Sequence, residues 1–190
     1  MPGVIVVVAS FAGGYRCDII LPLSFIKNPL LWVDLMSQLK ATWTAAPDFG
    51  YRLVARRFKE ARARGIKEPI QDLDLSSILG MQNAAEPIRK DTHAMFQELF
   101  LDYGLTKNWF ASAYGLAENV VYVSYLQEYK LSNAGAENGA EFFAVGHRKK
   151  FPPSQVVKIV NPETCEEVDD ENVGEIWLSG PSVTGRYFNQ

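Results

Sequence analysis

This chain has few residues of the kinds that build disulfide frameworks, metal clusters or histidine-based catalytic sites. Its 190 residues include 2 cysteines and 2 histidines. Cys17 and Cys165 lie far apart and show no metal or redox spacing, so we expect two free thiols and a reducing, cytoplasmic compartment. His93 has polar sequence neighbours and no second ligand or carboxylate spaced to make it a base, so we expect it on the surface.

Strong positive charge and long apolar runs are also missing. The formal net charge is -3, and the densest group of cations is the short stretch 147–150, so nothing favours binding to nucleic acid. The apolar run at residues 4–9 is too short for a signal peptide or a membrane span, and we expect a buried strand there. No Gly-x-Gly-x-x-Gly follows a strand, which argues against a dinucleotide-binding oxidoreductase.

Strand and helix patterns alternate along the rest of the chain. Helical periodicity predicts helices at residues 30–39, 51–64 and 87–103, the last two ended by Gly65 and Gly104. Short apolar runs predict strands at 4–9, 18–21, 41–44, 78–82, 109–112 and 120–123. Two later segments, 157–161 and 173–183, predict a strand, a turn and a second strand. We therefore expect an α/β fold with a largely parallel sheet, flanking helices and a small C-terminal β unit.

Two short blocks follow predicted strands and combine residue types suited to a nucleotide. Tyr114-Gly115-Leu116-Ala117-Glu118 follows the strand at 109–112. An aromatic ring can stack on a base, a glycine lets backbone approach phosphate, and a carboxylate holds a divalent cation. Asn83-Ala84-Ala85-Glu86-Pro87 follows the strand at 78–82, and its proline ends that strand. Together the two blocks predict a nucleotide site.

A third block, Ala46-Pro47-Asp48-Phe49-Gly50-Tyr51, completes a recognisable order. In this order the three blocks resemble those of the adenylate-forming enzymes, which make an acyl-AMP from ATP and a carboxylate. They are most similar to the fatty acyl-AMP ligase branch, where a Tyr-Gly-Leu-Ala-Glu block has Ala before the Glu, as Ala117 is here. The likeness extends over about residues 21–188, nearly the whole chain.

The resemblance implies a role for each block. It places the ring of Tyr114 against adenine, with Asn83, Ala84 and Ala85 on the other side of the base, and Glu118 as the Mg²⁺ ligand and catalytic residue. The remaining residues implied in nucleotide binding are Glu86, Pro87, Gly115, Leu116 and Ala117. The implied cofactors are ATP/AMP and Mg²⁺, and the implied partner is a fatty acid or another acyl substrate. Pro47, Phe49 and Tyr51 would line the acyl side, although core packing explains them equally well.

Several parts of the resembled enzymes have no counterpart in these residues. The chain has no Gly/Ser/Thr-rich phosphate loop ending in Lys, no ribose-binding Asp after a Thr-Gly pair, and no small C-terminal domain with its Lys. Ala84 also replaces the usual Gly. The resemblance thus implies a central fragment of the larger N-terminal domain, with an incomplete core and no activity of its own. We expect the adenine and Mg²⁺ motifs in an α/β part at 1–126, an insertion at 127–150 and the start of a β subdomain at 151–190.

Two functions from different classes remain open at this point. The first is a fragment of an acyl-activating ligase, whose expected partners are an acyl carrier protein or the missing parts of the same enzyme. The second is a truncated, non-catalytic relative that serves as a nucleotide-binding, acyl-binding or interaction module.

Overall fold

The computed structural model describes residues 10–106, 108–126, 131–132, 142–146, 151, 153–169 and 172–188. The strand predicted at 4–9, the cations at 147–150 and most of the predicted insertion lie outside these ranges.

The centre of the molecule is a four-stranded sheet in the order β1-β2-β3-β4. Its strands are β1 (Trp43–Ala46), β2 (Gly80–Asn83), β3 (Phe110–Tyr114) and β4 (Ser124–Leu126). The first three run parallel, and β4 is antiparallel to β3. This confirms the largely parallel sheet that the alternating pattern predicted.

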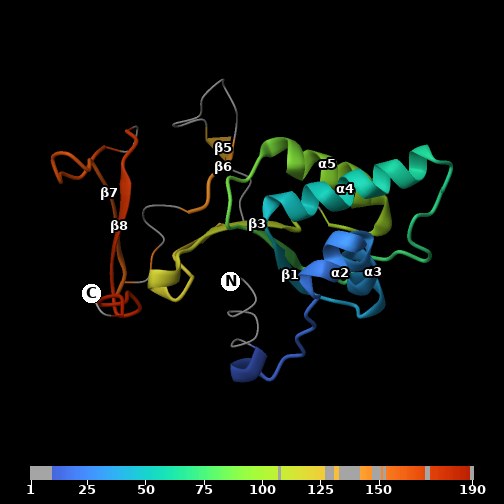
Figure 1. The fold of residues 1–190 in the computed structure, drawn as a ribbon, viewed down its shortest axis with the longest axis horizontal. Helices are drawn as coiled ribbons and strands as arrows, with labels where there is room; N and C mark the ends of the chain where they lie inside the picture. Colours follow the sequence, from blue (N-terminus) through green and yellow to red (C-terminus); the bar gives the residue numbers. More distant parts are fainter. Residues whose placement is uncertain are drawn as a thin grey trace.

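Helices pack along this sheet in chain order. They are α2 (Pro22–Lys27), α3 (Leu30–Gln38), α4 (Asp48–Ala63) and α5 (Lys90–Phe100), which runs into the 3₁₀ turn η1 (Leu101–Tyr103). Figure 1 shows α4 and α5 side by side over the sheet, with α2 and α3 next to them. Gly65 and Gly104 follow the last two helical segments with φ of 87°, the left-handed conformation that glycine adopts without a steric penalty.

An aromatic core fills the space between the helices and the sheet. Tyr51 of α4 meets Phe96 of α5 edge-on with ring centroids 5.2 Å apart, and Trp109 just before β3 lies 5.4 Å from Phe96. The Tyr51 hydroxyl donates a 2.8 Å hydrogen bond to the Gln82 carbonyl, so this buried phenol is satisfied. Aromatic packing therefore supports the strands up to the carboxyl edge of the sheet.

His93 is not on the surface, as we expected from its polar sequence neighbours, but inside this core. It is 6% exposed, and its ring stacks on Trp109 at 5.0 Å with an interplanar angle of 4°. His93 lies three residues before Phe96 and seven before Phe100, which puts it on the buried stripe of α5. Helical periodicity was the deciding signal, and the character of the adjacent residues was not.

Two predicted strands are absent from the structure. Residues 18–21 lead without strand pairing into α2, whose first position is Pro22. Residues 120–123 form a turn after the 3₁₀ segment η2 (Ala117–Asn119), with positive φ at Val120 and Val121. The apolar, β-branched composition favoured a strand, but hydrogen bonds within the turn outweigh it, and the ladder resumes only at β4.

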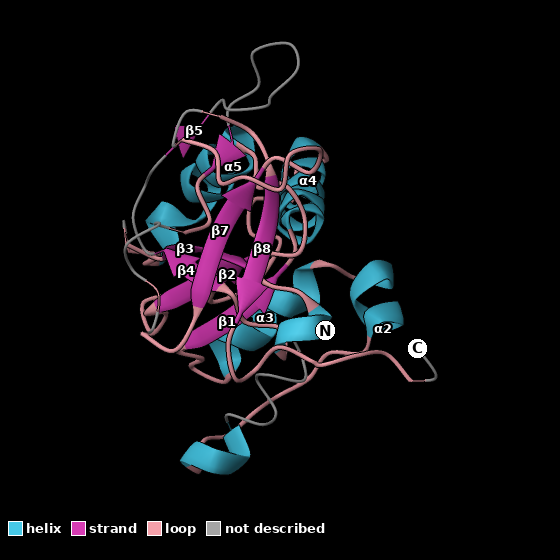
Figure 2. Cartoon of the chain, turned by 90° about the vertical axis from the view of Figure 1, so that its left-hand side faces the viewer, coloured by secondary structure: helices cyan, strands magenta, loops and turns pink. Residues whose placement is uncertain are grey.

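A second β unit lies at the other end of the molecule from the helices (Figure 1). It consists of β7 (Val156–Val160) and β8 (Glu175–Ser179), which pair antiparallel, and Figure 2 shows them crossing the direction of the main sheet. A short pair, β5 (Leu131–Ser132) and β6 (Phe142–Phe143), lies between the two parts of the chain. Within the described ranges, none of the helices has the length and apolar character needed to cross a membrane.

Candidate functional site

The three sequence blocks meet at one edge of the main sheet. Parallel pairing aligns Ala46 with Asn83 and Asn83 with Ser112, so β1 and β2 end level and β3 runs two residues further at the same edge. The block at 46–51 continues β1, the block at 83–87 continues β2, and the block at 114–118 continues β3. The carboxyl edge of parallel strands is where open α/β sheets bind their ligands.

The turn after β3 depends on a glycine. A Cβ on Gly115 would lie 1.6 Å from the carbonyl oxygen of Val121, so only glycine allows the chain to fold back this closely. Leu116 accepts backbone hydrogen bonds from Asn119 at 3.2 Å and from Val121 at 2.9 Å. This turn leaves Tyr114 and Glu118 half-buried at the edge, neither of them packed into the core.

Glu118 is held by the segment that follows β8. The Tyr187 hydroxyl donates to Glu118 Oε1, and the Thr184 amide donates to the Glu118 carbonyl at 2.7 Å. Next to them, Ser182 Oγ donates to Asn119 Oδ1 at 2.8 Å. The hydrogen bond from Tyr187 lowers the pKa of Glu118 and, in return, raises that of the phenol. Glu118 is therefore a carboxylate at neutral pH, as a cation ligand has to be.

The loop after β2 is bound to the start of α4. Glu86 Oε1 accepts a 2.6 Å hydrogen bond from the Phe49 amide, one of the amide groups that the first turn of a helix leaves unpaired. Ala85 has φ of 75°, which is unusual for a residue with a Cβ. A non-glycine residue in this conformation persists only where neighbouring contacts hold it.

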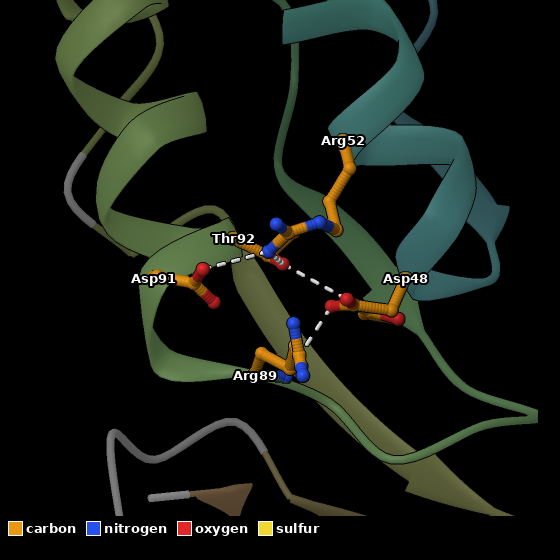
Figure 3. Close-up of polar contacts among 6 residues, drawn as sticks. Asp48, Arg52, Arg89, Asp91 and Thr92 are labelled. Carbon is orange, nitrogen blue, oxygen red and sulfur yellow. Dashed lines mark hydrogen bonds and ion pairs between the residues drawn. The ribbon is translucent and has the colours of Figure 1, made fainter. Parts of the chain in front are cut away.

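Beneath the loop lies a buried carboxylate, Asp48, which is 3% exposed. Figure 3 shows it between Arg89 and Thr92, with Arg52 bridging Thr92 and Asp91. The Thr92 hydroxyl donates to Asp48 Oδ2 at 2.8 Å, and Arg52 Nη1 lies 2.8 Å from Asp91 Oδ2. The first turns of α4 and α5 are thus joined by charged and polar groups.

The residues expected to line the acyl side do not share one environment. Tyr51 is buried in the aromatic core and is hydrogen-bonded to Gln82, so its ring already has protein neighbours. Phe49 is 51% exposed and Pro47 is half-buried. Of the three, only Phe49 and Pro47 present apolar surface at the edge. The acyl-side role stays a prediction for these two.

The site offers a cation one carboxylate. Across the described ranges, no three His, Cys, Asp or Glu residues gather in the manner of a metal cluster. Mg²⁺ commonly takes one or two carboxylates and fills its other positions with phosphate oxygens and water. Glu118, ionised and half-exposed, fits such a site if a nucleotide brings the phosphates.

A shallow depression of about 310 Å³ lies elsewhere, between α3 and residues 69–71. Asn28, Asp34 and Gln38 are among the residues that line it. It shares no residue with the three blocks and has no bearing on the site at the sheet edge.

Sequence reasoning missed two sets of residues that shape this edge. Asp48 lies inside a block in which only the apolar residues were given a role, and no sequence pattern singled out Thr92 or Arg52. Tyr187 and Ser182 lie more than sixty positions beyond Glu118 and Asn119. A polar residue at the first position of α4, directly after a strand and a proline, was the available signal for Asp48.

Comparison with known proteins identifies the family. A family model described as AMP-binding enzyme matches residues 1–188. The long-chain-fatty-acid–AMP ligase FadD28 of Mycobacterium tuberculosis is 30% identical over 98% of this chain and 33% of its own length. The medium-chain-fatty-acid–acyl-carrier-protein ligase TtuA of Teredinibacter turnerae is 30% identical over 92% of this chain and 28% of its own. This chain thus spans about a third of the length of the curated relatives it matches.

Solved structures give the same result. A fatty acyl-adenylate ligase from L. pneumophila, crystallised with acyl adenylate and pyrophosphate, superposes with a TM-score of 0.82 at 32% identity. The match covers 98% of this chain and 34% of that one. With the family model, the relatives and the fold in agreement, the chain belongs to the AMP-binding enzyme family, and the similar proteins include fatty-acid–CoA and fatty acyl-AMP ligases.

Proposed function

We propose that this chain supplies the adenine-binding and cation-binding part of a ligase that forms acyl-AMP from ATP and a fatty acid. The observation that carries the proposal is the register of the parallel strands. It brings the ends of β1, β2 and β3 together, and with them the three blocks that resemble fatty acyl-AMP ligases.

In this proposal the base lies between the two loops. The ring of Tyr114 stacks on one face of adenine, and the backbone of Asn83, Ala84 and Ala85 lines the other face. The half-buried position of Tyr114 leaves part of its ring available, and a stacked aromatic pair adds about 1 kcal/mol beyond the buried area. The fixed backbone of the 83–87 loop limits the entropy lost when the base binds.

Glu118 would hold Mg²⁺ against the phosphates, and the ion would neutralise charge as pyrophosphate leaves. In the reaction, a carboxylate oxygen of the fatty acid attacks the α-phosphorus, the bond to the bridging oxygen breaks, and pyrophosphate departs. No protein nucleophile takes part. The residues of this chain therefore act by alignment and charge placement.

Fewer residues of this chain are assigned to the fatty acid than to the nucleotide. Phe49, exposed at the start of α4, offers an apolar surface beside the nucleotide loop, and an alkyl chain could pack there. The name of TtuA refers to an acyl carrier protein, and such a protein is a candidate acceptor for the acyl group here.

We do not expect full turnover from these 190 residues, because they contain no phosphate loop ending in Lys. Losing one donor to developing negative charge typically costs about 2.7 to 4 kcal/mol of transition-state stabilisation, and several are missing here. Binding, rather than catalysis, is the property to measure on this chain.

The test is titration of the chain with ATP, with and without Mg²⁺, in wild type and in Glu118→Ala. Wild type should bind ATP more tightly with Mg²⁺, and the variant should lose that difference. Glu98→Ala, on the exposed face of α5, is the matched control and should behave like wild type. If wild type and Glu118→Ala gain equally from Mg²⁺, the proposed role of Glu118 is wrong.

A further inference from the structure

We propose that Asp48 is a positioning residue that holds the nucleotide loop at 83–87 in its binding conformation. The claim that this loop binds a nucleotide rests on the proposed function, whereas the effect of Asp48 on the loop can be tested without nucleotide. The sequence blocks assign Asp48 no role, and its carboxylate is buried.

The contacts of Asp48 come from two segments, the end of β2 and the start of α5. Its Oδ1 accepts from Asn83 Nδ2 at 2.9 Å and from the Arg89 amide at 3.4 Å, and its Oδ2 accepts from the Thr92 hydroxyl at 2.8 Å. Asn83 ends β2, Arg89 precedes α5, and Thr92 lies in the first turn of α5. One buried side chain therefore fixes both ends of the loop to the start of α4.

The direction of these hydrogen bonds follows from the chemistry of the groups. A carboxylate only accepts, so the Asn83 amide has to turn its Nδ2 toward Asp48. Thr92 Oγ1 accepts from Arg52 Nη1 at 3.1 Å, so the single hydroxyl hydrogen of Thr92 is available for Asp48. The Thr92 hydroxyl and the Asn83 amide are thereby both oriented toward Asp48, and Asn83 Oδ1 has no hydrogen-bond partner among the residues that the structure describes.

The loop also binds the start of α4 through one of its own side chains. Glu86, in the middle of the loop, accepts from the Phe49 amide at 2.6 Å, directly after Asp48 in the chain. The start of α4 and the loop are therefore bound reciprocally, by Asp48 from below and by Glu86 from the exposed side. The unusual backbone of Ala85, with φ of 75°, lies between these two anchors.

An asparagine at position 48 would change the arrangement. Its carboxamide carries one accepting oxygen and one donating nitrogen. Asn83 or Thr92 would then face a donor and have to rotate, which loosens one end of the loop. Asp48→Asn keeps the size of the side chain but removes its negative charge and replaces one acceptor with a donor, so it is a direct probe.

The experiment measures amide hydrogen exchange across the whole 190-residue chain, without nucleotide, in four variants. Asp48→Asn and Thr92→Val should speed exchange at residues 84–89 by about tenfold, which corresponds to ~1.4 kcal/mol. Thr92→Ser keeps the hydroxyl and should restore wild-type exchange. Ser37→Ala removes a buried hydroxyl that accepts from the Asp74 amide at 2.9 Å, far from the loop, and should leave 84–89 unchanged.

ATP affinity is then measured on the same proteins. Asp48→Asn and Thr92→Val should weaken ATP binding several-fold, and Thr92→Ser should not. Unchanged exchange at 84–89 in both variants, or equal acceleration throughout the chain, would refute the positioning role. If neither variant folds, Arg52→Met, at a half-exposed position, tests the same network and should speed loop exchange by a smaller factor. Failure of wild type to bind ATP would count against the proposed function and leave the exchange result standing.

Discussion

The two halves of the candidate site are built in different ways. The 83–87 loop rests on a buried carboxylate and the aromatic core, whereas the Glu118 turn is held by Ser182, Thr184 and Tyr187, all of them exposed. Buried hydrogen bonds hold their geometry firmly, while exposed hydrogen bonds compete with water and contribute less. We infer that the base-binding half is preformed and that the cation-binding half adjusts as its ligands arrive.

The same contrast separates the main sheet from the hairpin. Phe96 is fully buried among aromatic rings, whereas Trp177 of β8 is 43% exposed and its indole donates to Glu175. Stability should therefore concentrate around the sheet, and the hairpin should open first. Four perturbations sharpen or break this picture, from the largest expected effect to the smallest.

Phe96→Ala should destabilise the fold by about 4 kcal/mol, because it removes a ring at the centre of the core. Trp177→Ala, the matched aromatic truncation on the hairpin, should cost less than about 1 kcal/mol, because nearly half of its ring is already in water. Urea unfolding followed by circular dichroism measures both. Similar losses from the two variants would mean that the core is not where the stability lies.

Acid should destabilise the fold through His93. Burial lowers the pKa of His93 from 6.5 to about 4. As pH falls from 6.5 to 4, the unfolded chain binds this proton first, so stability decreases across that window by about 3 kcal/mol. His93→Phe should flatten the pH dependence of the urea midpoint between pH 6.5 and 4, and an unchanged slope would place the responsible group elsewhere.

Gly115→Ala should distort the turn that carries Glu118. The new Cβ would overlap the Val121 carbonyl, and the backbone would have to move, at a cost of about 2 kcal/mol. Gly185→Ala, in the segment that contacts this turn, meets no atom within 4 Å and should be nearly neutral. Thermal unfolding compares the two, and equal melting temperatures would contradict the close approach.

Tyr187→Phe should have the smallest effect. It removes the hydroxyl that donates to Glu118 and leaves the ring in place. We expect Mg²⁺-dependent ATP binding to weaken by about threefold, because an exposed hydrogen bond contributes little. Tyr122→Phe, at another exposed phenol, is the control. A loss of tenfold or more would mean that the cation-binding half is as rigid as the base-binding half.

The sequence predicted the helices and the parallel sheet because their periodicity is local. Helices α3, α4 and α5 follow the apolar spacing seen in the residues, and Gly65 and Gly104 lie where those patterns stop. The division of the chain at residues 126 and 150 stays a prediction.

The failures have different causes. The buried position of His93 was already indicated by its helical spacing, whereas the other failures depend on contacts that composition does not report. The turn at 120–123 is specified by Gly115 meeting the Val121 carbonyl, and composition alone favoured a strand there. The Asp48 network and the Tyr187 contact join positions more than thirty residues apart, and no local pattern reports such pairs. The blocks of the site were recognisable from sequence, whereas the groups that hold them were not.

The most direct measurement locates the bound cation relative to the edge of the sheet. Mn²⁺ with ATP replaces Mg²⁺, and its paramagnetism broadens the amide NMR signals of nearby residues. Signals of residues 114–118 and 83–87 should broaden strongly with Mn²⁺ and ATP together, while those of Ile159 and Ile176 in the hairpin should stay sharp. Broadening that avoids the sheet edge, or that spreads evenly over the chain, would contradict a nucleotide and cation site there.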